Sequence, residues 1–169
     1  LQDNHPNLYL YSDKKIIDIV FDSLTNSITE PLTELEFYKH ITIISSFIKD
    51  GHTIILPSSH TTAFHNANSK FLPYKLKLID NHLFIEMILT SNNTISEGAE
   101  IASINDVDTK TIIKQLTERQ VRDGYNETYP SWIIDNYFRE YYSYIFGHPN
   151  EFSIQYKINN ASFLTTIQA

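Results

Sequence analysis

The sequence has 169 residues, of which 41% are hydrophobic and 20% are charged, so it can form one generous domain or two small ones around a packed core. Its net charge of −7 argues against nucleic acid or an anionic membrane surface as a partner, because both require a basic face. The lack of cysteine excludes disulfide scaffolds and thiol nucleophiles, and no apolar run approaches the roughly 20 residues of a membrane span.

Two helices are predicted in the first third of the chain. Ser12 is a suitable N-cap, and the apolar residues from Ile16 to Leu24 predict an amphipathic helix over about residues 13–26. A second helix should begin at the capping box Thr33–Glu36 and end at Gly51. Its apolar face is predicted to consist of Phe37, Ile41, Ile44 and Ile48.

Strands are expected after Gly51. Residues 53–56 form a short β-rich run, and the polar residues 58–70 are predicted to form a loop. Alternating apolar residues then predict a hairpin, with strands near 74–79 and 82–89 and a tight turn at Asp80-Asn81.

The second half of the chain mixes strands and helices. A strand is predicted over 99–104, and Asp108 should cap a helix that carries Ile112, Ile113 and Leu116. Pro130 should begin another helix, with an apolar stripe of Ile133, Tyr137, Tyr141 and Tyr144. Strict alternation from Phe152 to Ile158 predicts a final strand, and residues 163–169 read as a strand cut short.

One run goes beyond periodicity. Residues 98–105 read GAEIASIN, which resembles the glycine–strand–turn sequence that PDZ-like domains of bacterial proteases carry before a helix. Gly98 suits an unusual φ at the strand entry, and Asn105 tolerates a positive φ in the turn. Asp106 stands where a second glycine is usual. The alternative is an ordinary strand–turn–helix in an unrelated α+β domain.

A second run lies upstream. Residues 50–53 read DGHT at the end of a predicted helix, which is similar to the N-terminal region of tail-specific (C-terminal processing, tricorn-like) serine peptidases. The match extends to residues 5–9 and the helical segment after them. The resemblance implies an α+β fold, in which an N-terminal helical pair precedes a PDZ-like, partly open β-sheet domain with two helices.

The resemblance also implies a domain order and a binding mode. Residues 1–57 would be the N-terminal helical region, 58–160 the PDZ-like domain, and 161–169 the start of a truncated catalytic core. Such a module captures the C-terminus of a peptide as an added edge strand. The candidate substrate-binding residues are Leu72, Tyr74, Leu76, Ile112 and Leu116.

His52 is the candidate catalytic base. In the tricorn-like branch a histidine just before the module activates the serine, and His52 matches that position, with Asp50 nearby. The alternatives are a histidine that packs or caps after a helix, and a competing Ser59-His60 pair in a polar segment. No plausible nucleophile motif follows residue 150, so the serine is expected outside this chain.

These observations predict the substrate-recognition portion of a secreted serine peptidase, inactive alone, with peptide or unfolded protein C-termini and its own catalytic domain as partners. The alternative is a stand-alone peptide-binding module without catalysis. Neither a metal nor a cofactor is expected, because the seven histidines lack ligand spacing. The chain begins at Leu1 rather than Met, which we interpret as removal of an export signal, so a periplasmic or extracellular location is expected.

Overall fold

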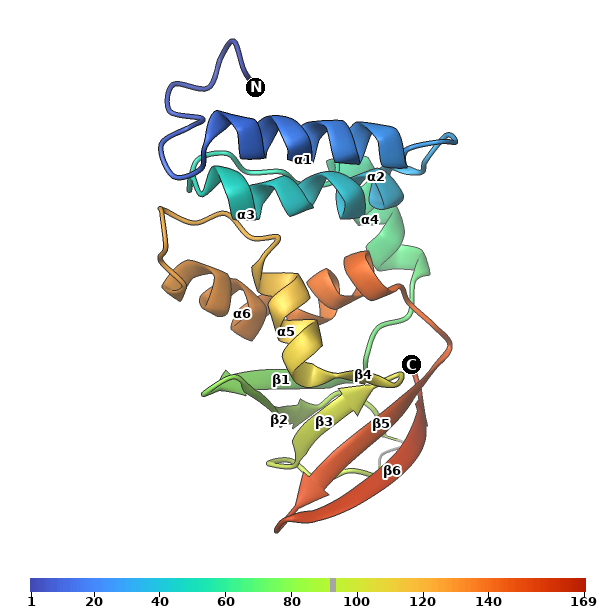
Figure 1. The fold of residues 1–169 in the computed structure, drawn as a ribbon. Coiled ribbons are helices and arrows are strands. Elements are labelled where there is room, and N and C mark those ends of the chain that lie inside the picture. The colour runs from blue at the N-terminus through green and yellow to red at the C-terminus, as the bar shows by residue number, and fades with distance from the viewer. Residues whose placement is uncertain (92–93) are drawn as a thin grey trace. The chain divides into compact units, whose positions relative to one another are not determined.

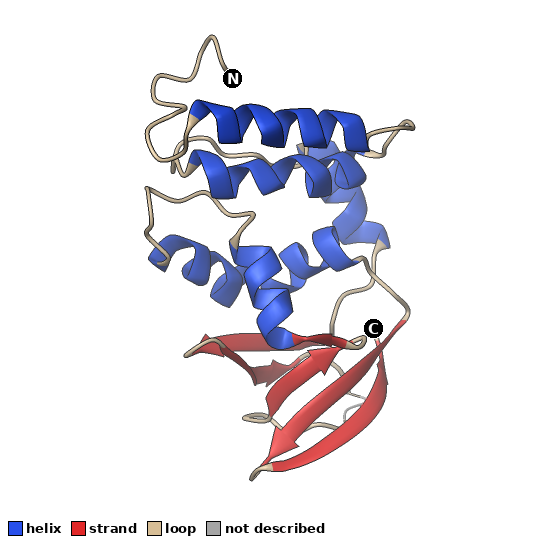
Figure 2. Ribbon diagram, viewed as in Figure 1, coloured by secondary structure: helices blue, strands red, loops and turns tan. Residues whose placement is uncertain are grey.

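The computed structural model describes residues 1–91 and 94–169. The chain forms two compact units. The helical unit consists of Leu1–Ala67 and Glu118–Pro130, and the sheet unit of Asn68–Thr117 and Ser131–Ala169. Helices and an open antiparallel sheet together make an α+β fold (Figures 1 and 2), which confirms the predicted fold class. These units do not coincide with the domain boundaries predicted at residues 57 and 160, which stay a prediction.

The helical unit is built on α1 (Lys14–Ser27), α2 (Glu34–Ile41), the short 3₁₀ helix η1 (Thr42–Ile44), α3 (Ser45–Ile48) and α4 (Ser59–Asn68). Its core consists of the buried side chains Leu8, Ile17, Ile44 and Ile48, with Val20, Phe21, Leu24 and Ile55 packed against them. Burial of these apolar groups is what holds the short helices in place, because helices of four to eight residues are not stable alone.

One of the two predicted N-terminal caps differs in the structure. The N-cap of α1 is Asp13, whose carboxylate accepts from Lys15 N–H, whereas the hydroxyl of Ser12 donates to the Phe47 carbonyl 2.6 Å away. The capping box at Thr33 and Glu36 is present as predicted.

The second predicted helix is broken, and this changes its buried face. The turn at Thr42–Ile44 is 3₁₀, with about three residues per turn, so the buried stripe shifts by one position. Tyr38 is buried and Phe37 is 48% exposed, the reverse of the prediction. The helix ends at Ile48, and Lys49, not Gly51, takes the left-handed conformation with φ 55°.

The segment after Gly51 was predicted wrongly. Residues 53–57 form no strand, and 59–68 form helix α4 instead of a loop. The reason is Ser58, whose hydroxyl accepts from Thr61 N–H and caps the helix, while its own N–H and hydroxyl donate to Glu34.

The sheet unit contains β1 (Tyr74–Ile79), β2 (His82–Ile88), β3 (Glu100–Ile104), β4 (Val107–Asp108), β5 (Glu151–Ile158) and β6 (Ala161–Gln168). All pairings are antiparallel, in the order β1-β2-β3-β5-β6, and β4 pairs with β3. β1 and β6 are therefore the edge strands. Residues 161–168 pair with β5 along its whole length.

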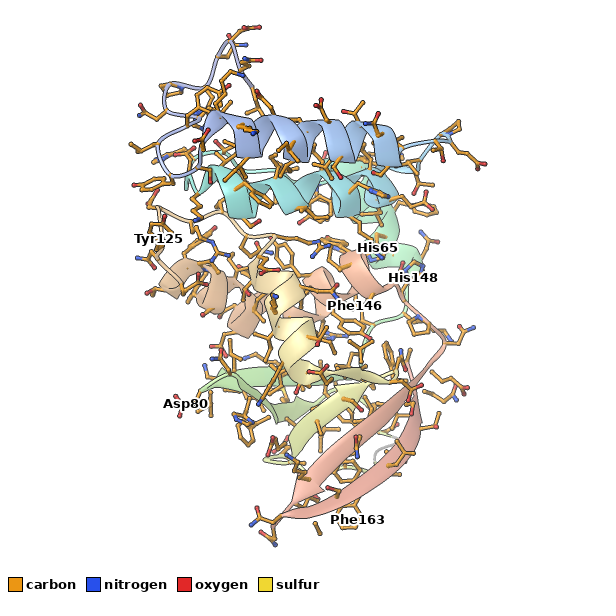
Figure 3. The ribbon with its side chains drawn as sticks, in the orientation of Figure 1. His65, Asp80, Tyr125, Phe146, His148 and Phe163 are labelled. Atoms are coloured by element: carbon orange, nitrogen blue, oxygen red, sulfur yellow. The ribbon has the colours of Figure 1, made fainter. Side chains whose placement is uncertain are left out.

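Three two-residue turns share one chemistry. Asp80-Asn81, Asn105-Asp106 and Asn159-Asn160 all have positive φ at both residues, from 49° to 67°. This conformation matches the twist of antiparallel strands, and Asn and Asp tolerate it better than other non-glycine residues. Asp106 therefore replaces the expected glycine without changing the turn, and Figure 3 shows Asp80 at the tip of the first hairpin.

Helices α5 (Thr109–Thr117) and α6 (Thr128–Phe146) complete the chain. α5 packs on β2, β3 and β4 and is capped by Asp108 as predicted. The apolar stripe predicted for α6 is wrong, because the helix is interrupted at Tyr137, where φ is −130°. Tyr137 is 45% exposed, and the buried residues are Ile133, Ile134, Phe138, Tyr142 and Ile145.

Candidate functional site

The predicted substrate-binding side chains lie in the core of the sheet unit. The exposed fraction does not exceed 2% for any of Leu72, Tyr74, Leu76, Ile112 and Leu116. In this conformation their side chains are covered. A peptide contact through these side chains therefore stays a prediction.

The outer edge of β1 is held at two points by α6. Asp135 accepts a hydrogen bond from the N–H of Leu78 at 2.8 Å, and its other oxygen lies 2.5 Å from the Lys77 ammonium. Arg139, one turn further along α6, donates from Nε to the carbonyl of Leu72 at 2.7 Å. Leu76 lies two residues before Leu78, so its N–H and carbonyl also point to the outer edge.

Two hollows lie along this edge. One, of about 160 Å³, is lined by Lys75, Leu76, Leu89, Asp135, Asn136, Phe138, Arg139 and Glu140. The other, of about 340 Å³, is lined by Leu78, Asp80, Asn81, Ser131, Trp132 and Asp135. Asp135 stands between them. An edge strand beside hollows is the geometry that strand addition requires, since backbone bonds hold the peptide and pockets take alternate side chains.

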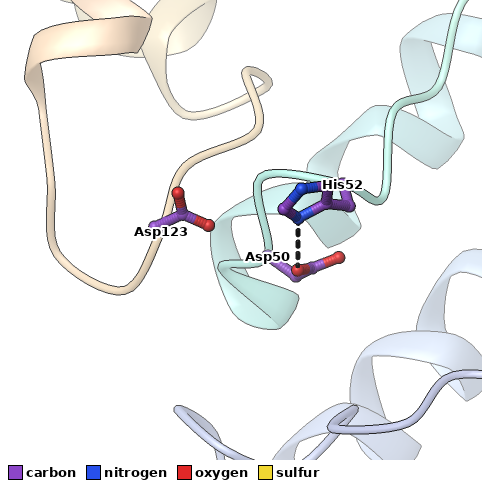
Figure 4. A group of neighbouring side chains, drawn as sticks. All are labelled: Asp50, His52 and Asp123. Carbon is purple, nitrogen blue, oxygen red and sulfur yellow. Dashed lines mark ion pairs between the residues drawn. The ribbon is translucent and has the colours of Figure 1, made fainter.

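His52 lies in the helical unit, on the turn that follows α3 (Figure 4). Its side chain is 93% exposed, and its Nδ1 is 3.7 Å from Oδ1 of Asp50. This distance is too long for a hydrogen bond, so Asp50 does not fix the tautomer of His52. A histidine base needs such an anionic neighbour, and the exposed ring leaves Nε2 accessible.

The Asp50 carboxylate is held by neighbouring side chains. Its Oδ2 accepts from the Thr53 hydroxyl at 2.5 Å and lies 3.3 Å from Nε2 of His5. The Thr53 hydrogen bond, aided by His5, holds the pKa of Asp50 below its usual value against the opposing effect of burial. Asn7 N–H donates to Nδ1 of His5, which places the His5 proton on Nε2. Nε2 of His5 also lies 2.8 Å from the Thr53 hydroxyl oxygen. Because this nitrogen carries the proton, His5 is a donor to Asp50 and does not serve as a base for Thr53.

Asp123 is the residue of this cluster that the sequence did not reveal. It lies 72 positions after Gly51, yet its Oδ1 accepts from the Gly51 N–H at 3.0 Å. The Gly124 N–H donates to the Lys49 carbonyl, which fixes the two loops together. A Cβ on Gly51 would lie 2.7 Å from Oδ1 of Asp123, so the glycine is needed for the close approach. Only the fold brings these segments together.

The competing pair Ser59-His60 opens helix α4, and both residues are exposed. Consecutive residues of a helix point about 100° apart, so their side chains do not face each other as a nucleophile and its base must.

The run that resembled a PDZ-like signature has the local geometry expected of it. Gly98 has φ 80° and Asn105 has φ 49°, while Ile101 and Ile104 are buried in the core. Asn105 also forms two hydrogen bonds with the backbone of Ser153 on β5. Its N–H donates to the Ser153 carbonyl, and its side-chain oxygen accepts from the Ser153 N–H. The run therefore pins β3, its turn and β5 together.

No known family description matches this sequence, and no curated protein matches it. Solved structures of CPAF, a chlamydial serine protease, share the fold. A CPAF variant with a serine-to-alanine mutation matches with a TM-score of 0.55 at 14% identity over 96% of this chain. Mature CPAF matches with a TM-score of 0.51 at 10% identity, and its complex with lactacystin with 0.53 at 10%.

The chain spans 28% to 29% of the length of these CPAF structures. At such low identity the likeness concerns the fold alone. In the part of the chain that the structure describes, no helix has the length and hydropathy to cross a membrane. The fold of these 169 residues is therefore one that occurs in part of a serine protease.

Proposed function

We propose that the chain is the substrate-recognition portion of a secreted, tail-specific serine peptidase. In this proposal the sheet unit is a PDZ-like module that captures the C-terminal segment of a peptide or unfolded protein. The fold likeness to CPAF supports a protease context, and the run at 98–105 supports the module. A periplasmic or extracellular location belongs to the same proposal.

The outer edge of β1 is the observation that carries this proposal. Between the two anchors at Leu72 and Leu78, Leu76 directs its N–H and carbonyl to the outer edge, beside a hollow of about 160 Å³. The residue is 1% exposed, so pairing with a peptide would require a local opening of this edge. A peptide strand that pairs with Leu76 would place a side chain in that hollow, against Phe138 and the stem of Arg139. The guanidinium of Arg139, which lines the same hollow, would be a donor to a terminal carboxylate.

His52 would be the general base of the complete enzyme. Its exposed ring and its anionic neighbour Asp50 suit proton transfer from a serine supplied outside these residues. The chain alone is then expected to hydrolyse no peptide. Hydrolysis of an unstructured protein by the purified chain, lost in His52→Ala, would contradict this part of the proposal.

The second candidate function is a stand-alone peptide-binding module without catalysis. It shares the β1 edge but gives His52 no chemical role. Measuring peptide hydrolysis by the full-length protein separates the two. Hydrolysis that is lost in His52→Ala supports the peptidase, and peptide binding without any hydrolysis supports the module.

Peptide binding is tested by fluorescence anisotropy with a labelled peptide that has an apolar, free C-terminus. The matched control is the same peptide with an amidated terminus. The proposal predicts saturable binding of the free acid and at least tenfold weaker binding of the amide, because a charge-assisted hydrogen bond is worth about 1.5–3 kcal/mol. Equal binding of both peptides would contradict capture of the carboxylate.

A further inference from the structure

We propose that Asp50, His52 and Asp123 bind one divalent transition-metal ion, with Zn²⁺ as the best match. Each residue offers one ligand atom, and the three atoms all lie within 4.8 Å of one another. Figure 4 shows the two carboxylates and the imidazole gathered where the turn after α3 meets the loop that carries Asp123. All three belong to the helical unit.

The distances fit a metal after small side-chain rotations. Ligands at about 2.0–2.2 Å from a tetrahedral zinc ion lie roughly 3.3–3.6 Å apart. Nδ1 of His52 and Oδ1 of Asp50 are 3.7 Å apart, close to that separation. His52 and Asp123 are exposed, so rotation of their side chains can close the remaining distance of about 1 Å at little packing cost.

Both carboxylates are held in place by hydrogen bonds. Asp50 uses Oδ2 for Thr53 and His5, which leaves Oδ1 toward His52. Asp123 uses Oδ1 for the Gly51 N–H and keeps Oδ2 available. Such outer hydrogen bonds orient metal ligands in known sites and are part of what makes the site bind.

The charge of the cluster favours a cation. Within residues 1–91 and 94–169, no lysine or arginine forms an ion pair with Asp50 or Asp123. The nearby Lys49 ammonium lies 4.0 Å from the centre of the Tyr125 ring and is thus turned to that ring. Two carboxylates held this close repel each other, and a bound divalent ion would offset that repulsion.

The ligand set selects the kind of metal. An imidazole with two carboxylates suits Zn²⁺, whereas Ca²⁺ takes six to eight oxygen ligands and Mg²⁺ needs a near-octahedral oxygen set. Three protein ligands leave the fourth position of zinc to water. No metal spacing is visible in the sequence, because Asp123 is distant from the other two residues, and the proposal therefore departs from the expectation of no metal.

Metal binding has a consequence that rests on the proposed function. If Nδ1 ligates zinc, the neutral ring carries its proton on Nε2, so neither nitrogen can accept a proton from a serine. Zinc would then inhibit the complete enzyme at His52. The binding itself does not depend on that function, so it is measured on the chain without substrate or catalytic partner.

The test is a calorimetric titration of ZnCl₂ into the 169-residue chain at pH 7, with MgCl₂ and CaCl₂ as comparison ions. We expect one saturable zinc site per chain, lost in His52→Ala and in Asp123→Asn. The asparagine keeps an acceptor for the Gly51 N–H, so this variant should fold. Gly51→Ala removes no ligand but displaces Asp123, and should weaken binding roughly 10- to 100-fold.

The control variant is His60→Ala, because His60 is exposed and lies outside the cluster. It should bind zinc as the unmodified chain does. Circular dichroism of each variant verifies the fold. Absence of a saturable zinc site, or unchanged affinity in His52→Ala and Asp123→Asn, overturns the proposal. Retained zinc binding without any peptide binding supports this site and contradicts only the proposed recognition function.

Discussion

Asp135 on helix α6 accepts a hydrogen bond from the backbone N–H of Leu78 at the outer edge of β1, 2.8 Å away. This bond satisfies one of the groups that an edge strand otherwise presents to other chains. It also marks where a pairing peptide has to stop. The stretch of the outer edge between the two anchors therefore runs from Leu72 to Leu78.

Replacing Asp135 with alanine should expose the amide of Leu78. A hydrogen bond to a charged acceptor is worth about 1.5–3 kcal/mol, so exchange of this amide with solvent should be roughly 10- to 100-fold faster. Asp135→Asn keeps an oxygen acceptor and should change exchange much less. Amide hydrogen exchange followed by NMR measures both. Equal exchange in the three proteins would mean that the bond does not protect the edge.

The interruption of α6 at Tyr137 predicts a sharp contrast between neighbours. Phe138 is 3% exposed and Tyr137 is 45% exposed. Phe138→Ala should lower the free energy of unfolding by about 3–5 kcal/mol, as for other buried aromatic residues. Tyr137→Ala should cost less than about 1.5 kcal/mol, mainly from its edge contact with Trp132. Urea unfolding compares the two variants. Similar losses of unfolding free energy would contradict the interruption of α6 at Tyr137.

The capping box at α2 gives a second stability prediction. Thr33 accepts from Glu36 N–H, and Glu36 accepts from the Thr33 N–H and hydroxyl. Thr33→Ala should reduce the free energy of unfolding by about 1 kcal/mol, whereas Thr33→Ser keeps the hydroxyl and should be close to neutral. A thermal melt that gives the two variants the same midpoint would contradict the assignment.

Stability should fall in acid through Asp50. Its pKa is lowered mainly by the Thr53 hydroxyl, so the unfolded chain binds a proton more readily than the folded chain. The resulting stabilisation is present above the ordinary carboxyl pKa of about 4 and is lost as the pH falls through the lower folded value. Between about pH 5 and about pH 3, the melting temperature of Asp50→Asn should fall by less than that of the unmodified chain. Melting temperatures that fall equally with pH in the two proteins would contradict a stabilising role of ionised Asp50.

Much of the fold follows from local pattern. Alternation predicted β1, β2 and β5, a strand was also predicted over 99–104, and the turns at Asp80-Asn81 and Asn105-Asp106 could be read from their composition. The errors arose where one local feature changed the phase of a helix. The 3₁₀ turn at Thr42–Ile44 and the interruption at Tyr137 each moved the buried stripe by one position. Helix α4 was missed because its apolar pattern is weak and its cap, Ser58, is anchored by the distant Glu34.

The candidate site was less predictable because it depends on tertiary contacts. His52 and Asp50 are two residues apart and could be paired from the sequence, but Asp123 reaches them only through the loop that pairs with Lys49. Asp135 and Arg139 were likewise invisible as partners of β1, since their spacing on α6 indicates only a shared face. The side chains proposed for peptide contact were chosen for being apolar, and apolar side chains at such positions are buried first.

The measurement that tests the central claim most directly is an NMR titration of the chain with a peptide that ends in an apolar residue and a free carboxylate. The account predicts that the largest amide shifts fall on β1, with Leu76 foremost, and on the α6 residues beside it, Asn136 and Arg139. Saturable shifts confined to these residues would support strand addition at this edge. Shifts elsewhere, or none at β1 at saturating peptide, would contradict the assignment of this chain as a recognition module.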